Sequence, residues 1–161
     1  MEGDYLKLEL EALLLNMFSN LQRESSKWDS LSEFLALEVS LDHFGKTNNN
    51  DNALVLSKCL GLAIEKLLIS NKSPSRKVGE LDNRGSHYYL ALYWAEALAN
   101  QNKDPELRNE FKELHHLLKS NESEIITELN EMQGNKVDLG GYYSIDNPEA
   151  EAIMRPSSTL N

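Results

Sequence analysis

The feature that most constrains the fold of this chain is the helical spacing of its apolar residues. Between residues 5 and 22 they recur at intervals of three and four positions, which places them on one face of a helix. This stripe consists of Leu6, Leu10, Leu13, Leu14, Met17, Phe18 and Leu21. The same spacing returns nearly everywhere along the chain. We therefore predict an all-α fold of about six helices.

Capping signals give the expected bounds of the next helices. A second helix should begin near Ser30, where Ser30 and Glu33 form a capping box, and should end at Gly45. A third should begin in the polar run 48–51 and continue to Leu68.

The later helices follow the same logic. Residues 86–101 are apolar on nearly all sides, which predicts a central buried helix. Asp104 and Pro105 provide a cap and a first-position proline for a fifth helix. A sixth should span residues 121–133.

Two segments interrupt the helical pattern. Residues 71–85 have no helical period and contain four cations within an otherwise acidic chain, namely Lys72, Arg76, Lys77 and Arg84. Because long connections in compact domains are often functional, we predict a long ordered loop there, the basic loop. The C-terminal tail should be irregular apart from a short helix that begins at Asn147 and ends at Arg155.

Composition limits the class of protein. The 161 residues suffice for one helical domain, residues 1–161, with its own core. A net charge of -10 argues against nucleic acid or an anionic membrane as the main partner. One cysteine, no basic leader and no apolar stretch of about 20 residues favour a soluble, cytoplasmic protein without a signal peptide or membrane span.

The residues show no motif of a complete active site. There is no G-x-G-x-x-G, Walker A or H-E-x-x-H sequence. Cys59 lies among leucines, as a buried structural thiol would, and adjacent His115 and His116 diverge too far to share a metal. The acidic run Glu122, Glu124, Glu128 and Glu131 is interpreted as a solvated helix face. We therefore predict no catalytic and no metal-ligating residues in this chain.

The basic loop is the one candidate site. Arginine forks, serine hydroxyls and loop N–H groups together suit a small anion such as phosphate or carboxylate. Alternatively, the cations pair with Glu80 and Asp82 and only fasten the loop to the domain. The residue types leave both interpretations open.

Three stretches closely resemble the C-terminal region of the monomeric, NADP-dependent isocitrate dehydrogenases. They are KWDSLSEFLAL at 27–37, NKSPSRKVGELDNRGSHYYLALYWAEALA at 71–99 and GGYYSIDNPEAEAIMRPSSTLN at 140–161. The string SPSRKVGELDNRGSH with LALYWA is the most specific part, and the similarity extends from about Asn16 to the end.

The resemblance implies what such a segment does. The family oxidises isocitrate with NADP and Mg²⁺ or Mn²⁺ and decarboxylates it to 2-oxoglutarate, in a chain several times longer than this one. Its C-terminal segment completes a helical part of the large domain and binds the adenosine end of the cofactor. The residues that bind isocitrate and the metal, and those that catalyse the reaction, belong to upstream portions that this chain lacks.

The cofactor residues can be carried over by position. Family members surround the adenosine 2′-phosphate with a histidine, two arginines and an aspartate. In this sequence the histidine position falls on Asn16, the arginines on Lys27 and Arg76, and the aspartate on Asp29. Lysine keeps the charge but not the bidentate fork, so the resemblance implies an NADP site with altered contacts.

Two hypotheses follow. In the first, the chain is a fragment or split half of such an enzyme, is inactive alone, and has the missing upstream part as its partner. In the second, it is a degenerate, non-enzymatic helical module for binding or interaction, as the altered Asn16 and Lys27 suggest. An exposed contiguous apolar patch is expected under the first hypothesis and a sealed surface under the second.

Overall fold

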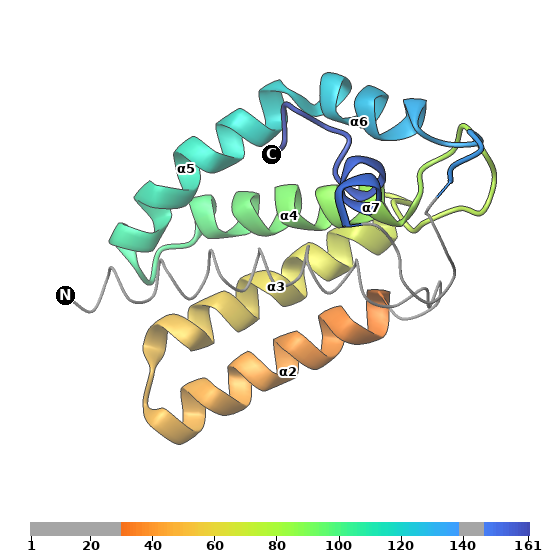
Figure 1. Cartoon of the computed structure of the whole chain (residues 1–161). Coiled ribbons are helices and arrows are strands. Elements are labelled where there is room, and N and C mark those ends of the chain that lie inside the picture. Colours follow the sequence, from red (N-terminus) through yellow and green to blue (C-terminus); the bar gives the residue numbers. More distant parts are fainter. Residues whose placement is uncertain (1–29, 139–146) are drawn as a thin grey trace.

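A computed structural model describes residues 30–138 and 147–161, and within these ranges the chain forms six helices and no strand (Figure 1). The helices are α2 (Ser30–Asn48), α3 (Asp51–Ile69), α4 (Asn83–Asn100), α5 (Pro105–Ser120), α6 (Glu122–Glu131) and α7 (Asn147–Met154). The predicted all-α class is therefore confirmed. The predicted first helix, residues 5–22, lies outside the described residues.

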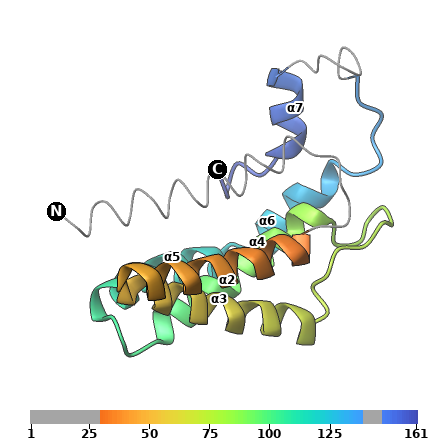
Figure 2. The same ribbon diagram turned by 90° about the horizontal axis from the view of Figure 1, so that it is seen from below.

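The helices from α2 to α5 follow one another back and forth, each packed against the one before it (Figure 1). Helix α6 continues in the direction of α5 after a bend at Asn121 and contacts α4 as well. The view from below shows α7 beyond the end of this stack, close to α6 (Figure 2). Helix α4 thus has neighbours on several sides.

The core is centred on α4, as its apolar sequence predicts. Tyr88, Leu90 and Leu98 have no exposed surface, and the Trp94 indole N–H donates to the Leu56 carbonyl of α3 at 3.1 Å. On the other side, the Tyr88 hydroxyl donates to the Leu118 carbonyl of α5 at 2.7 Å. Buried polar groups of the aromatic residues are therefore satisfied by neighbouring helices.

The predicted end of α2 at Gly45 is wrong, because α2 continues to Asn48 and the chain turns at Asn49, whose φ is 51°. Gly45 is buried where α2 meets α3. A β-carbon at this position would lie 2.7 Å from the Leu54 side chain and 3.0 Å from the Asn50 carbonyl oxygen. The glycine therefore permits a close helix crossing rather than ending the helix.

The N-terminal bound of α4 also differs from the sequence prediction. The Asp82 carboxylate caps the helix by accepting from the Gly85 N–H at 3.0 Å, so α4 begins at Asn83 rather than Ser86. The basic loop is correspondingly shorter, and the name is kept below for residues 70–82. Arg84 belongs to the first turn of α4.

Other local signals are confirmed. Asn50 caps α3 by accepting from the Ala53 N–H, and Asp104 caps α5, with Pro105 at the first helical position. Cys59 is buried, and burial raises the pKa of its thiol to about 11, as expected of a structural thiol.

The acidic face of α6 is only partly a solvated surface. Glu128 binds the C-terminal tail: its carboxylate accepts from the hydroxyls of Ser157 at 2.6 Å, Ser158 at 3.0 Å and Thr159 at 3.2 Å. These bonds, led by the one from Ser157, hold the pKa of Glu128 below its ordinary value. The stability that they contribute is thus present at neutral pH and is lost as the pH falls through the lowered pKa.

No helix in the described part of the chain is both long and apolar enough to cross a membrane.

Two glycines give a matched test of the α2–α3 packing. We expect Gly45→Ala to lower the free energy of unfolding by about 1–3 kcal/mol, because the added methyl group overpacks the crossing. Gly61→Ala in α3 should instead raise it by up to about 1 kcal/mol, because helix propensity improves and the nearest atom to the new β-carbon, in Glu38, lies 3.6 Å away.

Urea denaturation of both variants checks this expectation. A stability gain at both positions would show that α2 and α3 are not closely packed at Gly45.

Candidate functional site

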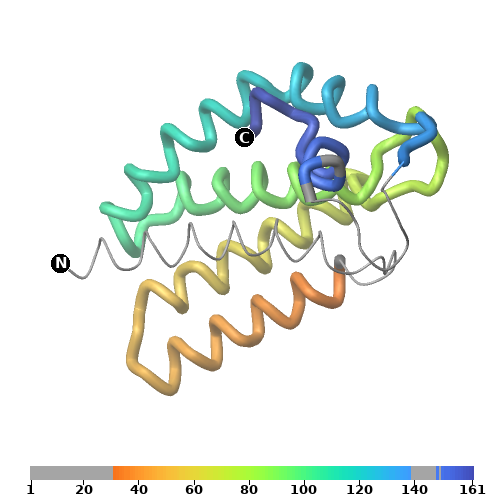
Figure 3. The backbone as a smooth tube through the Cα atoms, viewed as in Figure 1, coloured from red at the N-terminus to blue at the C-terminus, as the bar shows by residue number. Residues whose placement is uncertain are grey.

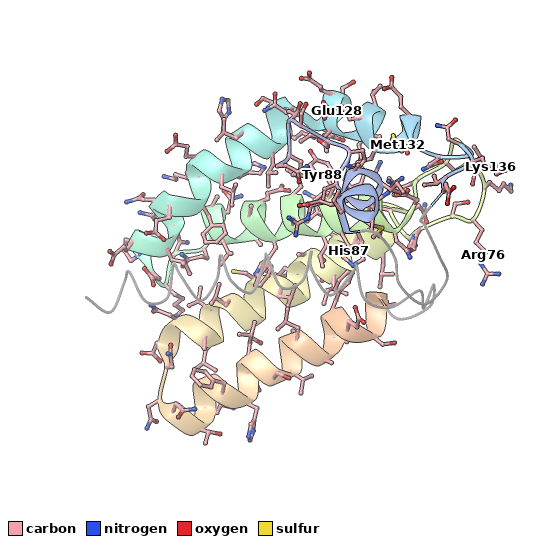
Figure 4. All side chains as sticks on the ribbon, in the orientation of Figure 1. Arg76, His87, Tyr88, Glu128, Met132 and Lys136 are labelled. Carbon is pink, nitrogen blue, oxygen red and sulfur yellow. The ribbon has the colours of Figure 1, made fainter. Side chains whose placement is uncertain are left out.

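Of the four predicted cofactor residues, only Arg76 lies within the described residues; Asn16, Lys27 and Asp29 lie outside them. The Arg76 side chain is exposed. It lies at the end of the molecule where the basic loop meets residues 132–138, the segment that follows α6 and includes the labelled Lys136 (Figure 4). The backbone trace shows the two segments side by side at this end (Figure 3).

The basic loop is ordered by its own hydrogen bonds, as predicted. The Ser75 N–H donates to the Leu81 carbonyl at 2.7 Å and closes the base of the loop. Within this closure the Glu80 N–H donates to the Lys77 carbonyl at 3.2 Å, and the Ser75 hydroxyl donates to the Glu80 carboxylate. Arg76 therefore stands on a closed turn.

The tip of the loop is fastened to the residues after α6. The Gly79 N–H donates to the side-chain oxygen of Gln133 at 2.7 Å, and the Gln133 side-chain nitrogen donates to the Glu80 carbonyl at 3.0 Å. A β-carbon on Gly134, whose φ is +74°, would lie 2.9 Å from the Val78 side chain. The sequence identified Gln133 only as a helix end, because nothing local marks a contact with residues more than fifty positions away.

Arg84 follows the second interpretation of the basic loop, in which its cations pair with acidic residues and fasten it to the domain. Its guanidinium donates twice to the Asp82 carboxylate, at 2.9 and 2.6 Å, and also to the carbonyls of Ile153 at 2.6 Å and Leu129 at 2.9 Å. The Arg84 side chain is only 15% exposed. This cation fastens α4, α6 and α7 together, so it is a structural group in the described fold.

The two lysines of the basic loop, Lys72 and Lys77, have partners of different kinds. Lys77 lies 3.5 Å from Glu80 and is largely exposed. The Lys72 ammonium lies 4.0 Å from the centroid of the Tyr89 ring, in the geometry of a cation–π contact. Tyr89 in turn donates to Glu122 at 2.9 Å.

Glu122 lies in a small ionic network. Lys119 contacts its carboxylate at 2.6 Å, and this hydrogen bond is the main cause of the lowered pKa of Glu122. The contacts of Tyr89 and Lys119 show that Glu122, like Glu128, is not merely part of a solvated face.

His87 is a buried polar residue that sequence reasoning did not single out. Its Nδ1 lies 2.5 Å from the Asn83 carbonyl oxygen, and its ring meets that of Phe34 edge-on at 4.9 Å. Since a carbonyl only accepts, Nδ1 carries the proton. Burial lowers the pKa of His87, so the imidazole is neutral and serves α2–α4 packing.

Within residues 30–138 and 147–161, no group of three or more histidine, cysteine, aspartate or glutamate residues is placed to hold a metal ion. This range includes His115 and His116.

These features define an acidic, all-helical segment with one ordered basic loop at its end. The family model described as monomeric isocitrate dehydrogenase matches residues 18–161, a range that includes Lys27, Asp29 and Arg76 but not Asn16. The chain therefore belongs to the monomeric isocitrate dehydrogenase family.

Several bacterial relatives are closely similar to most of this chain. Isocitrate dehydrogenase (NADP) 2 of Psychrobacter sp. and that of Colwellia maris are each 54% identical over 135 residues, and isocitrate dehydrogenase (NADP) of Azotobacter vinelandii is 52% identical. Each alignment covers 84% of this chain but only 18% of the relative's own length.

The structural role of Arg84 can be tested by a charge-conserving change. We expect Arg84→Lys to lower the free energy of unfolding by about 1.5–3 kcal/mol, because an ammonium cannot reproduce a planar fork that binds one carboxylate and two carbonyls. The matched control is Lys77→Ala, whose side chain is 80% exposed; it should change stability by no more than about 0.5 kcal/mol.

Chemical denaturation of the two variants measures the difference. Equal stabilities would contradict the structural role assigned to Arg84.

Proposed function

We propose that this chain is the C-terminal part, a fragment or split half, of an NADP-dependent isocitrate dehydrogenase, and that it contributes the site for the adenosine 2′-phosphate of NADP. The complete enzyme would oxidise isocitrate and decarboxylate it to 2-oxoglutarate, in the cytoplasm. The observation that carries this proposal is the family match over residues 18–161 together with the 18% coverage of NADP-dependent relatives.

The chemistry of the basic loop supports the cofactor assignment. Arg76 presents an exposed guanidinium on a turn that is closed by backbone hydrogen bonds, and such a fork matches the oxygens of a phosphate. We assign Lys27 as the second cation, Asp29 as the neighbouring acid and Asn16 as the residue at the histidine position. A 2′-phosphate would then be held by charge at Arg76 and Lys27 and would distinguish NADP from NAD.

The surface of α2 supports a larger partner. Leu31, Leu35 and Val39 recur at intervals of four residues on this helix and are 38%, 46% and 61% exposed. We call these three residues the α2 stripe. Such a stripe is suited to packing against the missing upstream part of the enzyme. That part would also supply the Mg²⁺ or Mn²⁺ ligands, as the family resemblance implies.

The runner-up proposal is a non-enzymatic helical module. It is favoured by two contacts within the described residues: Glu128 binds the C-terminal tail, and Arg84 joins three helices. A module of this kind would fold and act without any upstream part.

Titration of cofactors tests the site. We expect Arg76→Ala to weaken NADP binding by about 1.5–3 kcal/mol, the usual worth of a charge-assisted hydrogen bond, and to leave NAD binding unchanged. Lys77→Ala is the matched control from the same loop and should have a smaller effect, because its ammonium lies 3.5 Å from Glu80. Equal NADP affinity of wild type and Arg76→Ala would refute the assignment of Arg76.

Complementation tests the split-enzyme proposal. Isocitrate-dependent NADPH formation should be absent with this chain alone and should appear when the folded upstream part of a relative is added in trans. Val39→Asp should abolish this rescue, because it places a charge on the α2 stripe. Lys58→Asp on α3, another exposed position, should not. A folded upstream part that gives no activity would instead favour the helical module.

A further inference from the structure

The side-chain amide of Gln133 makes two hydrogen bonds to the backbone of the basic loop. Its oxygen accepts from the Gly79 N–H at 2.7 Å, and its nitrogen donates to the Glu80 carbonyl at 3.0 Å. The same nitrogen donates to the Asn130 side chain at 3.0 Å. Both amide hydrogens and the amide oxygen are thus engaged, so the amide is fixed from the α6 side as well as from the loop.

This pairing holds a part of the loop that would otherwise be costly to order. Gly79 has a φ of +85°, and no atom outside its immediate neighbours lies within 4 Å of where its β-carbon would be. Besides Gln133, the contact between Val78 and Gly134 holds the tip. Since the Ser75–Leu81 bond closes the base and Gln133 holds the tip, the backbone of Arg76 is fixed between two anchors.

We propose that Gln133 is a positioning residue for the phosphate-binding loop: by holding Gly79 and Glu80, it keeps Arg76 where it can bind the adenosine 2′-phosphate. This inference rests on the proposed function of Arg76. A loop that is ordered before the ligand arrives loses less conformational freedom on binding, so its affinity is higher. Gln133 itself makes no contact with the ligand in this proposal.

The geometry predicts a selective effect. In this proposal Arg76 binds the 2′-phosphate, so loosening the loop should weaken the binding of ligands that carry this phosphate more than that of ligands without it. A role limited to overall stability would weaken binding of both ligand types alike or of neither.

The variant Gln133→Met keeps the length of the side chain and removes its hydrogen bonds. With the full 161-residue chain, adenosine 2′,5′-bisphosphate and adenosine 5′-phosphate are titrated separately. We expect Gln133→Met to weaken the bisphosphate by about 3- to 10-fold, the effect of losing one or two hydrogen bonds, and to leave the monophosphate unchanged. Hydrogen exchange of the Gly79 amide should become faster.

Asn135→Leu is the matched control. Its side-chain amide donates to the Glu131 carbonyl within the same turn, so its loss should not change the affinity for either nucleotide.

A double-mutant cycle separates this inference from the function on which it rests. In the Arg76→Ala background, Gln133→Met should have no further effect on the bisphosphate, because Gln133 acts through Arg76. Additive losses, or an unchanged bisphosphate affinity in Gln133→Met despite faster exchange at Gly79, would overturn the positioning role alone. Equal affinity of wild type for both nucleotides, or no binding of either, would overturn the proposed function and this inference together.

Discussion

The Arg84 guanidinium is the group on which the arrangement around the basic loop depends. It is largely buried and binds one carboxylate and two carbonyls, contributed by Asp82, Leu129 and Ile153. These belong to the end of the loop, to α6 and to α7, which are far apart in the sequence. Because unsatisfied buried carbonyls are costly, all three segments are held to the first turn of α4. The same Asp82 caps that turn, so helix initiation and long-range packing share one carboxylate.

The four cations between residues 71 and 85 therefore have different roles in the structure. Arg84 is a packing group, Lys72 lies on an aromatic ring, and Lys77 is next to Glu80. All four are cations of one short stretch in an acidic chain, so the sequence alone left both an anion site and a packing role open. Burial separates the two arginines: Arg84 is largely buried, whereas the Arg76 side chain is exposed on the closed turn.

What could be predicted from sequence was local in origin. The caps at Asn50 and Asp104 and the buried character of α4 depend on residues within a few positions of one another. The start of α4 at Asn83 was missed although its Asp82 cap is local, whereas the misses at Gly45 and Gln133 involve contacts with another part of the fold. Gly45 looked like a helix end because the approach of Leu54 is invisible in a one-dimensional pattern, and Gln133 bonds to residues 53 and 54 positions away. The site residues Asn16, Lys27 and Asp29 rest on the resemblance, and they remain predictions.

The proposed function also implies how this chain would affect the enzyme's kinetics: it would supply binding energy for the cofactor. In NADP the 2′-phosphate is far from the nicotinamide ring, so contacts at Arg76 would be nearly equal in the ground state and in the transition state of hydride transfer. Contacts of that kind lower KM for the cofactor without raising kcat. The excess of 26 acidic over 16 basic residues opposes the approach of an anionic cofactor. An ordered loop with several cations would offset this repulsion locally. It would attract the phosphate where the phosphate binds, while the rest of the surface stays acidic.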